Sequence, residues 1–165
     1  MGANYNIPQF MQSKYGLLWR FAAAFFASFT LASVAHSQFV LTRLTEIQVQ
    51  IPSADWLRMT VEDWLGLLPT YGSLVAIGLL IAFTLTGFLR KHYRSLPGWL
   101  YGVAGFTALL VIQLSLQPIM DITLLAGARS AMGIACQGLA GFVGGLVFYL
   151  LKPRARQHFR TSARF

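Results

Sequence analysis

Long apolar runs separated by short polar segments dominate the chain. Each run approaches or exceeds the roughly 20 residues of helix that cross the hydrocarbon of a bilayer. They cover residues 17–41, 70–89, 98–117 and 128–151. Because apolar residues continue through each run, the pattern predicts membrane-spanning helices. We therefore expect an all-α integral membrane protein whose four spanning helices form a bundle.

The segment between the first two spans, residues 42–69, has a different pattern. Within residues 53–68, apolar side chains recur at the 3.6-residue period of a helix, opposite Arg58, Glu62 and Asp63. This period predicts one amphipathic helix that lies flat at the membrane interface, on the outer side. The other connections are shorter, so residues 1–165 form a single membrane domain. It includes a tail at residues 1–16, a loop at 90–97, an outer loop at 118–127 and a basic tail at 152–165.

The first apolar run has two interpretations. A basic flank, an apolar core and small residues ending at Ala35 are typical of a cleaved signal peptide. However, the run continues to Leu41, which is long enough for an anchor. Small residues also recur on one helical face, at Ala24, Ser28 and Ala32, as in helices that pack closely. We favour the uncleaved anchor and keep cleavage as the alternative.

Composition agrees with a membrane protein and limits what the charge can mean. The chain is 56% hydrophobic and only 11% charged, which is hard to reconcile with a soluble domain of this size. Ten of the 13 basic residues flank the spans on one side: Lys14, Arg20, Arg90, Lys91, Arg94, Lys152, Arg154, Arg156, Arg160 and Arg164. All five acidic residues fall on the other. Cytoplasmic loops retain Lys and Arg, so we expect both termini in the cytoplasm.

The net charge of +8 is therefore explained mainly by topology. A lipid-binding role for the basic tail is the sharper alternative, since cations beside a helix end attract anionic head groups. We expect membrane lipid as a partner and no nucleic acid, because no aromatic platform or binding fold accompanies the basic run.

Two glutamines form the best internal pair. If the last two spans are antiparallel neighbours, matching Gly98 with Leu151 places Gln113 and Gln137 at one depth. They would then form an interhelix hydrogen bond, which we interpret as structural. Small residues along the same helices predict close packing, at Gly98, Gly102, Gly127, Gly138, Gly141 and Gly145.

Asp121 and Arg129 come together near the outer surface by the same matching. An arginine inside a membrane is costly unless paired, so Asp121 is its natural partner. With Gln117 nearby and His36 at the outer end of the first span, these residues would form a polar cluster. A structural salt bridge is the favoured interpretation, and a solute or proton site is the alternative.

No catalytic or cofactor signature is recognisable in the sequence. The three histidines lie at different depths, so they cannot provide paired axial ligands to a haem. A single cysteine, Cys136, excludes a disulfide framework and a cysteine zinc site. The sequence also lacks a metalloprotease motif and a phosphate-binding glycine loop followed by lysine. We therefore expect no catalytic residues, no metal and no cofactor.

Parts of the sequence resemble a group of small four-helix bacterial inner-membrane proteins. The resemblance rests on LPTYGSLVAIGLLIAF at 68–83, AGARSAMGIACQGLAGFVGG at 126–145, and the IP and MTVED pieces before them. It implies a bacterial inner membrane and supplies no activity. Together, these features predict a non-enzymatic accessory or scaffold subunit that packs with itself or with a larger membrane complex. The alternative is a small carrier or channel for a solute or for protons, using the outer polar cluster.

Overall fold

The computed structural model describes residues 9–46, 52–93, 95–119 and 131–152, and these are almost entirely helical, with no strand. The prediction of an all-helical chain is thereby confirmed. The elements are α1 (Gln9–Glu46), α2 (Ser53–Leu67), a π-helix η1 (Leu68–Gly72), α3 (Ser73–His92), α4 (Leu100–Ile119) and α5 (Ala131–Leu150).

Three helical stretches among the described residues are long and apolar enough to cross a membrane. They are Tyr15–Thr42, Asp55–His92 and Met132–Leu150. The expected third span contains the apolar helix Leu100–Leu116, which is shorter. The structure thus supports a membrane protein. Of the four expected spans, the third contains the shortest apolar helix.

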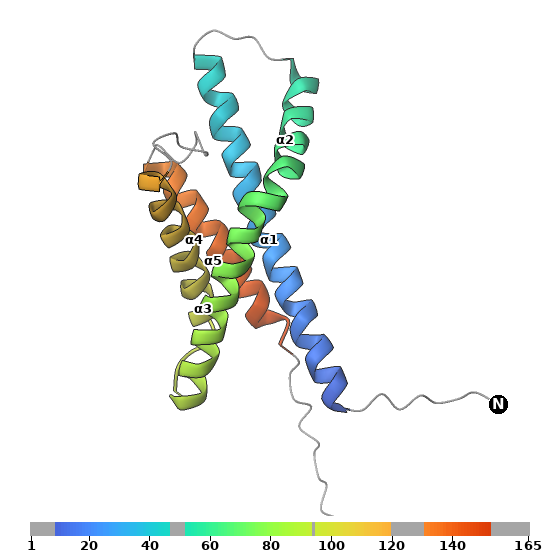
Figure 1. Ribbon diagram of the computed structural model, residues 1–165, viewed down its shortest axis with the longest axis vertical. Coiled ribbons are helices and arrows are strands. Elements are labelled where there is room, and N and C mark those ends of the chain that lie inside the picture. Colours follow the sequence, from blue (N-terminus) through green and yellow to red (C-terminus); the bar gives the residue numbers. More distant parts are fainter. Residues whose placement is uncertain (1–8, 47–51, 94, 120–130, 153–165) are drawn as a thin grey trace, which may run out of the picture.

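The chain passes up and down the bundle, with α2 and α3 forming one descending stretch (Figure 1). In that view α1 and α4 rise, whereas α2, α3 and α5 descend. The most extensive interhelix contacts join α4 to α5 and α1 to α5. The last helix is therefore the centre of the bundle, and α3 packs mainly against α4.

Helix α1 is much longer than its partners. Its 38 residues correspond to about 57 Å, whereas the 20 residues of α5 span about 30 Å. The α1–α2 hairpin consequently extends past the upper ends of α4 and α5 (Figure 1). Helix α2 returns antiparallel along α1, where the Trp64 indole N–H donates to Thr30 Oγ1 at 3.2 Å.

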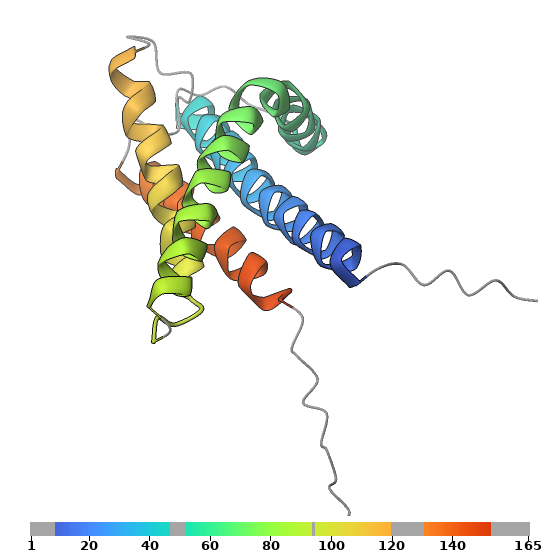
Figure 2. The same ribbon diagram turned by 60° about the horizontal axis from the view of Figure 1, so that its bottom comes forward.

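A π-helical turn joins α2 directly to α3. The backbone stays helical from Ser53 to His92, so the expected outer loop contains a helix that runs without interruption into the second span. Pro69 lies in η1 and has no N–H to donate to the preceding helical turn, which is a usual cause of a change of direction within a continuous helix. Figure 2 shows the change of direction between α2 and α3. Whether α2 rests on a membrane surface stays a prediction.

Glycines allow the backbones of α4 and α5 to approach closely. A Cβ built at Gly141 would lie 2.7 Å from the carbonyl carbon of Gly105, and one at Gly145 would lie 2.7 Å from Gly102 Cα. On the other side of α5, a Cβ at Gly144 would lie 2.7 Å from the carbonyl oxygen of Ala24. Only glycine fits at such contacts, so both central interfaces depend on the small residues of α5.

Candidate functional site

Gln137 of α5 connects three elements inside the bundle. Its amide nitrogen donates to the Ala32 carbonyl oxygen of α1 at 2.9 Å. Its amide oxygen accepts a hydrogen bond from the Tyr71 hydroxyl of η1 at 3.0 Å. Both side chains are buried. Because buried polar groups need partners, this arrangement fixes η1 and α1 against α5.

The expected hydrogen bond between Gln113 and Gln137 does not form, because Gln137 bonds to Ala32 and Tyr71 instead. The depth matching itself agrees with the contacts: Leu109 meets Gly141, and one helical turn further Gln113 lies level with Gln137. Gln113 is 2% exposed, and its amide nitrogen has no hydrogen-bond partner within the described part of the chain. Matching α4 with α5 by depth could not reveal that η1 and α1 also contribute hydrogen-bonding groups at the level of Gln137.

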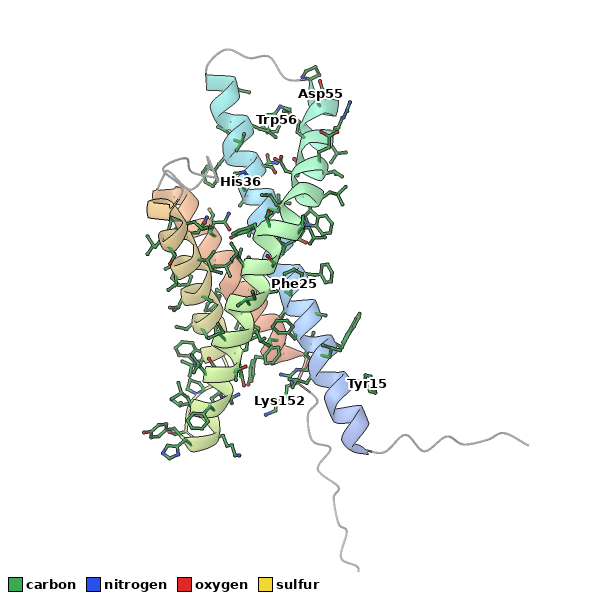
Figure 3. All side chains as sticks on the ribbon, in the orientation of Figure 1. Tyr15, Phe25, His36, Asp55, Trp56 and Lys152 are labelled. Atoms are coloured by element: carbon green, nitrogen blue, oxygen red, sulfur yellow. The ribbon has the colours of Figure 1, made fainter. Side chains whose placement is uncertain are left out.

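His36 lies inside the bundle, where it is 8% exposed. The neighbouring Ser37 hydroxyl donates to the Asp63 carboxylate of α2 at 2.8 Å. Figure 3 places His36 on the part of α1 that faces the other helices. The sequence pattern assigned Asp63 to the polar face of α2, so this buried contact was not foreseen.

The other members of the expected outer polar cluster lie outside the described residues or side chains. Asp121 and Arg129 belong to residues 120–130, and the side chain of Gln117 is likewise outside. The structure therefore places only His36 of that cluster. The structure also buries polar side chains on α1, η1, α4 and α5, which together with His36 we call the buried polar cluster: Ser28, Ser33, His36, Ser37, Tyr71, Gln113 and Gln137.

Within this cluster, several polar atoms lack a partner. Among the described residues, buried atoms without a hydrogen bond are Ser28 Oγ, Ser33 Oγ, His36 Nδ1 and Gln113 Nε2. An unpaired buried polar group costs about 1–3 kcal/mol.

At the opposite end of the bundle, Arg20 caps α5. Its Nε and Nη2 groups donate to the Phe148 carbonyl oxygen at 3.1 and 2.7 Å, and its guanidinium lies 4.4 Å from the Phe148 ring centroid. Carbonyls in the last turn of a helix have no partner within the helix, and a cation there also interacts favourably with the negative end of the helix dipole. The sequence identified Arg20 only as a topology signal.

The predicted packing glycines fall into two groups. Gly98, Gly102, Gly138, Gly141 and Gly145 all line the α4–α5 interface: Gly98 faces Tyr149, Gly102 faces Phe142, and Gly138 faces Phe106. Gly127 lies outside the described residues. Gly105, on the same side of the third span as Gly98 and Gly102, meets the backbone of Gly141, whereas Gly144, which the spacing did not single out, makes an equally close contact with α1.

Among the described residues, no three His, Cys, Asp or Glu side chains form a group that could hold a metal ion. No family model matches the chain, and no curated protein or solved structure is significantly similar to it. The geometry therefore offers helix packing, an internal polar cluster and exposed apolar surfaces as the features from which to infer function.

Proposed function

We propose that this chain is a non-enzymatic accessory or scaffold subunit, which packs with a larger membrane complex or with itself as a homo-oligomer. The supporting observation is an apolar stripe on the outward face of α2. Leu57, Val61 and Leu65 are 70, 49 and 58% exposed, one helical turn apart, on a hairpin that projects past α4 and α5. A stripe with this spacing suits docking against another apolar surface.

The contact surface differs from the one that the sequence suggested. In the sequence, the motivation for a partner was the small-residue faces of the spans that form α1, α4 and α5, because four short helices need not bury all of these faces against one another. Instead, they meet one another: Ala24 and Ser28 contact Gly144, and Gly105 contacts Gly141. The structure therefore directs the proposal to large apolar side chains on α2.

In the proposed arrangement the protein lies in a bacterial inner membrane, as a multi-pass protein with both termini in the cytoplasm. Charge supports this orientation: Arg90 and Lys91 lie in the last turn of α3 and Lys152 follows α5 at the lower end of the bundle, whereas Asp55 lies in the first turn of α2 at the upper end (Figure 3). Residues 17–41 are retained as an anchor, because Ala24, Ser28 and Ala32 are buried within the bundle. Helix α2 is then the amphipathic interfacial helix on the outer face.

The test compares assembly size in mild detergent by light scattering, combined with co-purification from native membranes. We expect a complex larger than the 18.3 kDa chain. Replacing Val61 and Leu65 together by Ser should dissociate it. The matched control replaces Leu74 and Ile77 by Ser, because they are equally exposed on α3. A wild-type protein that remains a strict monomer would overturn the proposal.

A carrier or channel for a solute or for protons is the second candidate. It is favoured by the unpartnered atoms of the buried polar cluster, since transport sites require polar groups at membrane depth. Proteoliposomes loaded with a pH-sensitive dye test proton movement directly. His36→Leu should abolish the flux, whereas Gln38→Leu, an exposed change on the same helix, should preserve it. Wild-type flux no greater than that of empty liposomes would dismiss proton transport.

A further inference from the structure

A lateral groove opens between α1 and α3, toward the end of the bundle that holds Arg20. The two helices diverge there (Figure 1), and the groove encloses about 570 Å³. Volumes of this size are typical of small-molecule sites, roughly 300–1,000 Å³. Its lining includes Leu17, Arg20, Phe21, Phe83, Thr84 and Lys152.

The lining separates apolar from cationic groups. Leucine and phenylalanine side chains form most of the walls, whereas Arg20 and Lys152 are the cations that line the groove. Figure 3 places Lys152 at the lower end of the bundle, where α5 terminates. A ligand that fits this lining has an apolar body and an anionic head. We propose that the groove between α1 and α3 binds a phospholipid with an anionic head group.

Arg20 is arranged to receive such a head group. Two of its five N–H groups donate to the Phe148 carbonyl oxygen, which fixes the guanidinium at the groove. Among the described residues the other three N–H groups have no hydrogen-bond partner, and they suit a phosphate oxygen. Lys152 is exposed and adds a second positive charge.

A second groove on the same protein provides an internal comparison. It lies between α3 and α4 and encloses about 440 Å³, but none of its lining residues is charged. This α3–α4 groove should accept acyl chains without regard to the head group. Anionic selectivity is therefore expected at the α1–α3 groove, which alone of the two has cations.

The experiment is native mass spectrometry of the full-length protein in mild detergent. The protein is offered equal amounts of phosphatidylglycerol and phosphatidylcholine with identical acyl chains. We expect the wild type to retain phosphatidylglycerol with roughly tenfold preference, because two cations contribute. Arg20→Gln with Lys152→Gln should remove the preference. Lys152→Gln alone, which leaves the Arg20 cap of α5 intact, should reduce it by roughly threefold to fivefold.

Two threonine variants separate groove binding from general surface charge. Thr84 lines the α1–α3 groove and Thr107 lines the α3–α4 groove, and each donates to the carbonyl four residues earlier. Thr84→Trp should remove the preference with both cations in place, whereas Thr107→Trp and Lys91→Gln should preserve it. Equal retention of the two lipids by the wild type would overturn the proposal. Unchanged preference in Thr84→Trp, with the melting temperature of the variant retained, would also overturn it.

Discussion

At the scale of single residues, the two buried glutamines differ in what surrounds them. Gln137 donates to Ala32 and accepts from Tyr71, whereas the amide nitrogen of Gln113 has no partner among the described residues. Net hydrogen-bond strength is modest, but a buried group that loses its partner costs considerably more. The same residue type therefore has opposite expected effects at two positions on the same level of the bundle.

Gln137→Leu is expected to lower the free energy of unfolding by about 1–3 kcal/mol, because it leaves the buried Tyr71 hydroxyl unsatisfied and removes the bond to the Ala32 carbonyl. Gln113→Leu should leave it nearly unchanged or raise it. Reversible unfolding in mixed detergent measures both. Tyr71→Phe should cost less in the Gln137→Leu background than in the wild type. Equal costs for the two glutamine variants would contradict the hydrogen-bonding pattern.

At the scale of elements, backbone contact between α4 and α5 determines how tightly the bundle closes. The glycine spacing in the sequence predicted this contact, and the antiparallel matching of positions agrees with the observed pairs, such as Leu109 with Gly141. The spacing of the glycines indicates which face of a helix has small side chains. It does not indicate which neighbour covers that face, and for this reason Gly144 against Ala24 was not anticipated.

Gly105→Ala is expected to destabilise the protein by about 1–3 kcal/mol, since its Cβ would meet the backbone of Gly141 and the helices would have to separate. The matched control is Gly66→Ala in α2, where no neighbouring atom lies within 4 Å of the added methyl. That change should instead stabilise the helix, by about 0.5–1 kcal/mol. Thermal unfolding of both variants provides the comparison. A neutral Gly105→Ala would show that the α4–α5 contact is looser than described.

At the scale of the whole molecule, the helical class and the apolar stretches could be predicted because both follow from hydropathy along the chain. The organisation of the polar interior could not. The sequence pattern predicted that Asp63 is a solvated residue on the polar face of α2. Its contact with Ser37 forms because α2 returns along α1. Likewise, the contact of Arg20 with the Phe148 carbonyl oxygen depends on where α5 ends. These contacts join residues 26 and 128 positions apart, so no local pattern records them.

The proposed orientation predicts which single cysteines react with a membrane-impermeant maleimide in intact cells. In a Cys136→Ala background, Arg58→Cys should be labelled, because Arg58 is exposed on the polar face of α2, which the proposal places outside. Ile77→Cys, on the lipid-facing side of α3, should stay unlabelled, although its side chain is well exposed in the isolated protein. Lys91→Cys should react only after the membrane is permeabilised. Labelling of Lys91→Cys in intact cells, without labelling of Arg58→Cys, would invert the orientation.

The central position of α5 also determines the order in which the helices can associate during synthesis. Among the described helices α5 is synthesised last, yet α1 and α4 make their most extensive contacts with it. Before α5 is synthesised, Ser28 and Gly105 lack their packing partners, and the Ala32 carbonyl oxygen lacks the amide donor of Gln137. The earlier helices therefore associate only loosely until α5 is inserted. A nascent chain truncated before Ala131 should be recognised as incomplete and degraded rapidly.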